Sequence, residues 1–326
     1  MGTNIKKKVL FLGVGLYNYD ILICNEMLKN YDVSYVYLVP VKKIPKWKYS
    51  LLSHLGKTDY LSRLNSELLL TSLKKLKGVS FDYIFVIKGS RLQDVHMDYI
   101  ERNFSSAKKI LYLWDSWSLI ENKPVLSKYF KTIYSFDSED CKKYGFILRP
   151  LFYTEKNEGF SIKEFDISFM GTDHSDRLEK LRNFRQLCDK NNLKYFLRLK
   201  TTGYPILCAR FNYGSYQKSD LDMLTTNFMT YEETMDLTRK SKAVIDFAHP
   251  AQCGLTIRTL ESLAMGCKLL TSNKYIKEYK DIQPECYCVL PEADEDTILS
   301  FLQSEVPAFS LPERYSISGF IKELLN

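Results

Sequence analysis

The chain has 326 residues, of which 45% are hydrophobic, and its 46 Lys and Arg against 39 Asp and Glu give a formal net charge of +7. This length is sufficient for two α/β domains, each with its own core. No run of eighteen apolar residues occurs, which excludes a transmembrane helix. The basic start leads into an apolar run that Asn18 and Asp20 interrupt, so we expect no signal peptide.

The cysteines and histidines exclude two further classes of protein. The eight cysteines show no regular spacing and predict reduced thiols in the cytoplasm rather than a disulfide framework. The four histidines lack zinc-ligand spacing, so we expect no metal site.

In the first 150 residues, apolar strands alternate with helical segments. We expect strands at 8–14, 33–39, 81–87, 109–114 and 132–136, and helices of about a dozen residues from 20, at 59–77, at 93–103 and from 137 to 144. Such alternation is typical of a parallel, doubly wound sheet.

The same pattern restarts after a polar segment at 149–161, which we interpret as an interdomain linker. Strands are expected at 165–171, 195–199, 243–247 and 268–273, with helices at 178–191 and 256–265. We therefore predict two domains, at 1–150 and 151–326. Residues 201–227 are assigned no element.

The most informative segment is Cys253–Glu261, which lies between two apolar strands. It predicts a tight loop at Gly254 and a helix capped by Thr256, so that the first helical N–H groups point into the crevice at the strand ends. Arg258 and Glu261 are three residues apart and share a helical face. Arg258 and the N–H groups suit a phosphate, and Glu261 suits the hydroxyls of a ribose. The alternative is an ordinary surface ion pair on a packing helix.

Together with Asp246, His249-Pro250 and Lys268–Asn273, this segment resembles the C-terminal signature of bacterial lipopolysaccharide and capsule glycosyltransferases of the GT-B fold. The resemblance is sharp over about thirty residues. It implies an α/β chain with two Rossmann-like, doubly wound parallel-sheet domains that face a central cleft. It also implies that 1–150 is the acceptor-side domain and that 151–326 holds a nucleotide-sugar donor without a metal or other cofactor. The donor-binding residues would be Gly171, Arg177, His249, Gln252, Gly254, Leu255, Thr256, Arg258 and Glu261, with Glu261 on the ribose.

A second phosphate loop is expected after the strand that ends at Gly171. Ser175 or Asp176 can cap the following helix, and Arg177 stands in its first turn, where a cation opposes the helix dipole unless it serves a ligand. The resembled family has a similar turn. The alternative is that Arg177 faces solvent.

On the acceptor side, Gly13 and Gly15 follow the first strand. A third glycine and an acidic residue ending the second strand are both missing, so this is not a dinucleotide fingerprint, and we expect a tight loop lining the cleft. Asp115 lies between Trp114 and Trp117 just past a strand. It is our candidate general base, with the indoles stacking on a sugar. Alternatively, Asp115 caps the next helix and the tryptophans are core.

Cations alternate with aromatic residues in the segment Lys42–Tyr49. This pattern suits an anionic membrane surface or a lipid-linked acceptor, and it equally suits a solvated loop. No RNA-binding motif is present, so no nucleic-acid partner is expected. The short pattern Asp220-Leu-Asp222 does not follow an apolar strand, which argues against a metal-binding motif, and Cys286 and Cys288 are expected in the core.

The resulting prediction is a cytoplasmic, metal-independent glycosyltransferase, with peripheral association at the inner membrane face as a further expectation. It transfers a sugar from a nucleoside diphosphate sugar to a cell-surface glycan, and closure at 149–161 would bring Asp115 toward the donor. A non-catalytic nucleotide-sugar binding protein remains the alternative, since it needs the helix at 256–265 but not Asp115. An NAD-dependent oxidoreductase is disfavoured by the incomplete glycine pattern.

Overall fold

The computed structural model describes residues 6–15, 18–40, 45, 48–49, 52, 55–157, 159, 161–249, 251–305 and 309–325. Its tertiary contacts divide the chain into two compact units. Unit 1 comprises Met1–Pro150, Ala251–Gly254 and Ile317–Asn326, and unit 2 comprises Leu151–Pro250 and Leu255–Ser316. Lys42, Lys43, Lys46 and Trp47 of the basic segment lie outside the described residues, as does Pro250.

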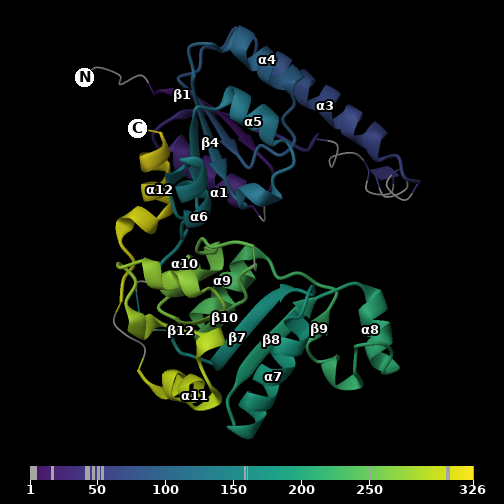
Figure 1. Cartoon of the computed structure of the whole chain (residues 1–326), viewed down its shortest axis with the longest axis vertical. Coiled ribbons are helices and arrows are strands. Elements are labelled where there is room, and N and C mark those ends of the chain that lie inside the picture. Colours follow the sequence, from purple (N-terminus) through teal and green to yellow (C-terminus); the bar gives the residue numbers. More distant parts are fainter. Residues whose placement is uncertain are drawn as a thin grey trace. The chain divides into compact units, whose positions relative to one another are not determined.

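Unit 1 is built on a six-stranded parallel sheet with the strand order β2-β1-β3-β4-β5-β6 (Figure 1). The strands are β1 (Lys8–Gly13), β2 (Asp32–Tyr37), β3 (Tyr83–Ile87), β4 (Lys108–Leu113), β5 (Thr132–Ser135) and β6 (Ile147–Leu148). The helices are α1 (Tyr19–Leu28), α3 (Thr58–Lys74), α4 (Asp94–Asn103), α5 (Lys123–Tyr129), α6 (Ser138–Tyr144) and α12 (Ile317–Leu324).

Both faces of this sheet are covered, which explains why its central strands are apolar throughout. Leu10 and Leu12 of β1 belong to the core that α3 and α4 complete on one face. On the other face, Tyr112 of β4 packs edge-to-face on Phe320 of α12, with ring centroids 4.8 Å apart. Helix α12 also contacts α1 (Figure 1). The last helix of the chain is therefore part of unit 1.

Unit 2 repeats the architecture with the parallel strand order β12-β11-β10-β7-β8-β9. Its strands are β7 (Phe165–Thr172), β8 (Tyr195–Lys200), β9 (Leu224–Thr225), β10 (Ser241–Asp246), β11 (Lys268–Thr271) and β12 (Tyr287–Val289). Its helices are α7 (Arg177–Lys190), α8 (Gly203–Arg210), α9 (Tyr231–Arg239), α10 (Ile257–Ala264) and α11 (Glu295–Gln303).

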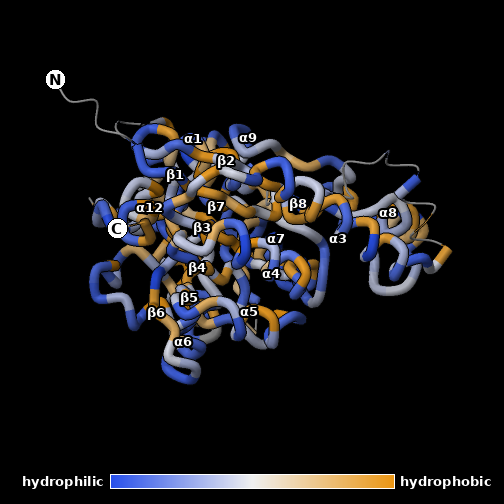
Figure 2. Tube along the Cα trace, turned by 90° about the horizontal axis from the view of Figure 1, so that it is seen from above, coloured by the Kyte–Doolittle hydropathy of each residue, from blue (hydrophilic) through white to orange (hydrophobic). Residues whose placement is uncertain are grey.

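The segment without a predicted element, 201–227, contains α8 and a short 3₁₀ turn at Lys218–Asp220. Helix α8 mixes hydrophobic and hydrophilic residues (Figure 2), and Tyr204 and Leu207 of the helix and Phe211 at its end are exposed. Such a helix has no amphipathic pattern that a sequence reading can recognise.

No helix in the described part of the chain is long and apolar enough to cross a membrane.

Candidate functional site

In unit 2, the candidate site lies where the strand order changes direction. Strand β7 stands beside β10; β8 and β9 extend the sheet to one side, and β11 and β12 extend it to the other. Loops leaving the carboxyl ends of β7 and β10 therefore diverge and open a crevice. Ligands of open α/β sheets bind at such a topological switch point.

A buried carboxylate fixes the start of α10 in this crevice. Asp246, 3% exposed at the end of β10, accepts hydrogen bonds from the hydroxyls of Thr256 (2.9 Å) and Thr259 (2.7 Å). Thr256 is the N-cap, and its Oγ1 accepts from the Thr259 backbone N–H at 3.1 Å. The expected N-cap is thus present, and the Asp246 carboxylate is used to hold the helix.

Arg258 brings a cation from α10 to the end of β7. Its Nη2 donates to the carbonyl oxygen of Met170 at 2.6 Å, and its guanidinium lies 5.1 Å from the ring centroid of Phe169. Gly171 makes this arrangement possible, because a Cβ there would stand 2.7 Å from the Phe169 ring. The glycine near the end of β7 therefore leaves room for the Phe169 ring beside Arg258.

Arg177, the first residue of α7, joins the ends of the two strands at the switch point. It donates from Nη1 to Thr172 O (3.1 Å) and from Nη2 to Phe247 O (3.2 Å). The capping expectation for this helix is wrong: Asp176 occupies the N-cap position without a capping hydrogen bond and forms an ion pair with Lys180 instead. The cation at the start of α7 is therefore held toward the crevice by backbone carbonyls.

Two histidines accompany these arginines in unit 2. His249 is exposed, and His174 follows β7 by two residues. Burial lowers the pKa of His174 below its ordinary value, and the positive charges of Arg177 and His249 lower it further. Arg177 and His249 therefore lie close enough to His174 to affect its protonation.

The remaining donor-side residues of α10 are less accessible. Glu261 is 4% exposed and lies near Tyr231 of α9, whose pKa is raised mainly by burial and next by the Glu261 charge. Leu255 is fully buried and serves as an apolar anchor before the helix. Lys268, which belongs to the resembled signature, is buried and donates to Phe301 O at 2.5 Å, so its role here is to fasten the end of α11.

The structure groups Gln252 and Gly254 with unit 1, although the sequence assigned them to the donor side. The Gln252 amide donates to Asp115 Oδ1 at 3.4 Å, and the Cys253 N–H donates to Asp137 Oδ2 at 3.0 Å. Gly254 packs so closely that a Cβ would stand 2.2 Å from the Phe136 carbonyl oxygen. Only a glycine fits this position.

Asp115 is half-buried and forms an ion pair with Lys88, with 2.5 Å between Oδ2 and Nζ. Lys88 follows β3 and has a φ of 65°, a left-handed conformation that is uncommon for lysine and is often found at functional sites. The predicted capping alternative is not seen, since the N-cap residue of the 3₁₀ turn at Trp117–Leu119 is Ser116.

The two tryptophans differ in environment. Trp117 is 6% exposed and packs in the unit 1 core, with its ring centroid 5.2 Å from that of Phe146, as the core alternative expects. Trp114 is half-buried, and its centroid lies 5.9 Å from that of Tyr19. Stacking of a sugar on Trp117 would require the core to open.

The loop after β1 is held in place by Asp20 of α1, the helix that follows it. The Gly15 N–H donates to Asp20 Oδ2 at 2.7 Å, and Tyr35 donates to the same oxygen at 2.9 Å. A Cβ at Gly13 would stand 2.0 Å from that oxygen. The carboxylate of Asp20 thus occupies the place that a dinucleotide phosphate would need, in line with a tight loop.

Both carboxylates of the Asp220-Leu-Asp222 pattern form ion pairs with arginines. Asp220, fully buried, accepts from Arg182 Nε at 2.9 Å and Nη2 at 2.6 Å, and Asp222 pairs with Arg185. Among the described residues, no group of three His, Cys, Asp or Glu side chains is placed to hold a metal ion. Metal independence stays a prediction.

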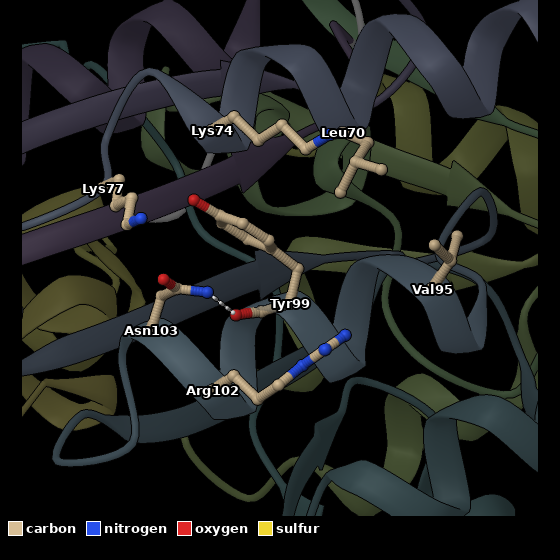
Figure 3. A pocket seen from close by; sticks show the side chains of 7 residues that line it. All are labelled: Leu70, Lys74, Lys77, Val95, Tyr99, Arg102 and Asn103. Carbon is tan, nitrogen blue, oxygen red and sulfur yellow. Dashed lines mark hydrogen bonds between the residues drawn. The ribbon is translucent and has the colours of Figure 1, made fainter.

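A pocket of about 630 Å³ lies between α3 and α4 in unit 1 (Figure 3). Lys74, Lys77 and Arg102 surround the ring of Tyr99 there. Lys74 and Arg102 stand in the last turns of their helices, where positive charge is favourable beside the helix dipole. Helix electrostatics accounts for these two cations without a ligand.

No protein-family model matches the sequence, and no curated protein matches it. Among solved structures, the chain is similar to the N-terminal domain of Candida albicans trehalose-6-phosphate phosphatase, with 12% identity and a TM-score of 0.56 over 100% of this chain and 94% of that chain. It is also similar to Methanocaldococcus jannaschii UDP-GlcNAc 2-epimerase in complex with UDP-GlcNAc and UDP, with 9% identity and a TM-score of 0.54 over 98% and 99% of the two chains. A third structure is an alpha-glucosyltransferase in complex with UDP and a mismatched DNA, with 12% identity and a TM-score of 0.52 over 98% and 90%.

These similarities show the fold. The chain has an α/β, GT-B-like fold with two six-stranded parallel sheets, as in glycosyltransferase and epimerase structures. The predicted fold class is confirmed. The finer resemblance to lipopolysaccharide and capsule enzymes stays a prediction.

Three site features escaped the sequence reading. Lys88 directly follows an apolar strand and precedes a glycine, and this position at a strand end could have indicated a site residue. His174 belongs to the cationic group, and Asp137 holds the Cys253 backbone. Asp137 and Cys253 are 116 residues apart, so nothing in their spacing predicts this contact, whereas His174 lies three residues before Arg177, a local signal.

Proposed function

We propose that this protein is a glycosyltransferase that takes a sugar from a nucleoside diphosphate sugar without a metal ion. The acceptor is a growing cell-surface glycan such as lipopolysaccharide or capsule. The donor binds in unit 2 at the carboxyl ends of β7 and β10, and a non-catalytic nucleotide-sugar binding protein is the alternative that the experiments below separate.

One observation supports the donor site above all others. Arg177 and Arg258 come from two different helices, and both donate to backbone carbonyls at the end of β7. Guanidinium groups are well suited to phosphate, because their planar N–H donors match its oxygens. Two such groups beside a helix N-terminus suit a diphosphate.

The proposed chemistry is electrostatic. The acceptor hydroxyl oxygen bonds to the anomeric carbon as the bond from that carbon to the diphosphate oxygen breaks, and the diphosphate leaves with the bonding electrons. Arg177, Arg258 and the first N–H groups of α10 stabilise the charge that develops on it. In an inverting transfer, Asp115 accepts the hydroxyl proton as general base, and Lys88 holds its carboxylate in place.

The cellular setting belongs to the same proposal. All eight cysteines are free in the structure, which suits a reducing cytoplasm. A lipid-linked acceptor would bring the enzyme to the inner membrane face. Binding to vesicles with and without anionic lipid, at low and high salt, tests that part separately.

A thermal-shift screen tests the donor site. UDP, GDP, CMP, dTDP and NAD are compared with and without EDTA. A ligand at a hundred times its Kd adds roughly 2.7 kcal/mol of stability, enough for a clear shift. We expect one nucleoside diphosphate to stabilise the protein equally in EDTA. If no nucleotide shifts the midpoint, the donor site is refuted.

Arginine variants then locate the site. Arg177→Ala and Arg258→Ala are each expected to raise the Kd of that nucleotide at least tenfold, about 1.4 kcal/mol. The matched control is Arg239→Ala, which removes an arginine of unit 2 that pairs with Glu155 and Asp236 on the surface. If the arginines only fasten strand ends, their variants unfold at lower temperature but keep the wild-type Kd.

Asp115→Asn separates an enzyme from a binding protein. We expect sugar transfer to be lost while nucleotide affinity stays within twofold of wild type. Transfer at the wild-type rate by Asp115→Asn would remove the proposed base. A protein that binds the nucleotide but transfers no sugar to any acceptor tested would favour the binding-protein alternative.

A further inference from the structure

Unit 1 contains a cavity of about 400 Å³ beside the carboxyl ends of β2 and β3. Its lining side chains come from the ends of β2 and β3, from α3 and from the segment before α5: Val39, Tyr49, Thr58, Leu61, Ser62, Asn65, Ser66, Ser90, Arg91, Leu92, Gln93, Glu121 and Asn122. Strands β2 and β3 flank β1, and the strand order changes direction between β1 and β3. The cavity therefore lies at the edge of the sheet where ligands of this architecture bind.

The chemistry of the lining indicates a neutral, hydroxylated ligand. Serine hydroxyls and side-chain amides predominate, and the charged lining side chains are one cation, Arg91, and one anion, Glu121. Leu61 and Leu92 provide apolar surface. This balance differs from the crevice of unit 2, where cations gather, and it matches a sugar ring with its hydroxyl groups and apolar C–H faces.

A buried histidine holds one wall of the cavity in place. His96 is fully buried, and burial lowers its pKa, which favours the neutral ring. Its Nδ1 accepts from the Gln93 N–H at 3.1 Å, so its Nε2 carries the proton and donates to Ser66 O at 3.0 Å. The Ser66 hydroxyl in turn donates to Gln93 Oε1 at 2.7 Å. Two lining side chains are thus oriented before any ligand arrives.

The lining also includes an acceptor that lacks a donor. Asn122 Nδ2 donates to Gly89 O at 2.9 Å and to Leu92 O at 2.8 Å, which fixes the orientation of the amide. Within the described ranges, its buried Oδ1 has no hydrogen-bond partner. A buried acceptor without a donor costs about 1–3 kcal/mol, and a ligand hydroxyl would supply the missing bond.

From this lining we propose that the cavity binds a neutral sugar residue. Its role as the subsite of the acceptor rests on the proposed transferase function, whereas sugar binding itself does not. The cavity and the Lys88–Asp115 ion pair share the loop after β3, because the lining residue Ser90 is two residues beyond Lys88.

Saturation-transfer NMR on the full chain tests the proposal with glucose, galactose, N-acetylglucosamine and their methyl glycosides. Ser62→Phe fills the cavity from α3, and Ser90→Ile fills it from the loop after β3. Thr71→Phe is the matched control, because Thr71 is exposed on α3 outside the cavity. Thermal unfolding checks that each variant is folded, and the Kd of the best nucleoside diphosphate is measured in parallel.

We expect at least one neutral sugar to bind the wild type and Thr71→Phe, and its Kd to rise at least tenfold in Ser62→Phe and Ser90→Ile. Glucose 6-phosphate should bind no more tightly than glucose, because the cavity has no excess of cations. No sugar binding to the wild type, or unchanged binding in both filled variants, overturns the proposal. Sugar binding without nucleotide binding would support the sugar site and refute the donor site instead.

Discussion

Around the end of β7, single side chains of like charge are held together. Arg177 stands at the first residue of α7, where the helix dipole disfavours a cation, and His174 and His249 lie within its electrostatic range. A cation at a helix start is unfavourable unless an anion offsets it, so the position of Arg177 suits the donor site that we propose.

The position of His174 beside Arg177 predicts that nucleotide affinity depends on pH. The pKa of His174 lies below its ordinary value, first because of burial and next because of Arg177 and His249, while Asp173 and Asp176 act in the opposite direction. A bound diphosphate raises the pKa again, so binding takes up a proton. We expect nucleotide affinity to rise as the pH falls toward and below about 6.5, the ordinary pKa of histidine, by at most tenfold per pH unit for one proton.

Calorimetry in two buffers with different ionisation enthalpies measures this proton uptake. His174→Asn should bind with less proton uptake and a flatter pH profile. A Kd that does not change with pH, or a profile unaltered in His174→Asn, would contradict the electrostatic coupling. The free energy of unfolding depends on pH in the opposite direction to nucleotide affinity. Because the folded protein lowers the pKa of His174, stability is lost as the pH falls below about 6.5, where the unfolded chain takes up the proton.

At the scale of elements, the start of α10 depends on its cap. The Thr256 hydroxyl accepts from the Thr259 N–H and donates to Asp246, so it links the helix to the end of β10. The cap of α9 is an instructive counterpart, since Thr230 accepts from the Glu233 N–H in a capping box. Two threonine caps in one unit thus differ in that only the first lies at the strand switch point.

Replacing each cap separates stability from function. Thr256→Ala and Thr230→Ala should each lower the free energy of unfolding by about 0.5–2 kcal/mol, since both leave a helical N–H without its acceptor. Only Thr256→Ala should also weaken nucleotide binding, and Thr256→Ser should restore both properties. Urea unfolding and calorimetry measure the two effects. Equal nucleotide affinity in both alanine variants would show that the α10 start is not part of the donor site.

The elements that the sequence predicted well are those with a local signal. The strand expected at 165–171 is β7 (Phe165–Thr172), and the helix expected at 59–77 is α3 (Thr58–Lys74), because apolar periodicity and caps are local. Helices α5, α8, α9, α11 and α12 were not predicted. Helix α8 exposes Tyr204 and Leu207, and the placement of α12 in unit 1 depends on contacts across the whole chain.

For the site residues too, only features with a local signal in the sequence could be predicted. Thr256 as a cap was readable from its own helix, and the structure confirms it. The carbonyl partners of Arg177 and Arg258 were not readable, because they belong to strands as far as 88 residues away. Trp117 illustrates the opposite error: aromatic residues beside a carboxylate suggest stacking, and yet the ring completes a core. Residue type indicates possible chemistry, and only the fold decides which side chains reach it.

At the scale of the whole molecule, neither unit is a continuous stretch of chain. Unit 1 includes α12 (Ile317–Leu324), which follows unit 2 in the sequence. Phe320 of that helix is fully buried, packs on Tyr112 and lies 5.2 Å from the Arg149 guanidinium. Arg149 is itself fully buried and pairs with Glu323 at 2.9 Å. We therefore expect α12 to contribute to the stability of unit 1.

This dependence predicts a selective loss of stability. Phe320→Ala should destabilise unit 1 by about 3–5 kcal/mol, because it leaves a cavity between α12 and β4. Lys322→Ala, at an exposed position of the same helix, should change stability by no more than about 0.5 kcal/mol. Scanning calorimetry with and without the nucleotide distinguishes the units: Phe320→Ala should lower the unfolding temperature of unit 1, and the nucleotide should still raise that of unit 2. If Phe320→Ala instead lowers nucleotide affinity together with stability, the two units do not unfold independently, and α12 supports the donor site as well.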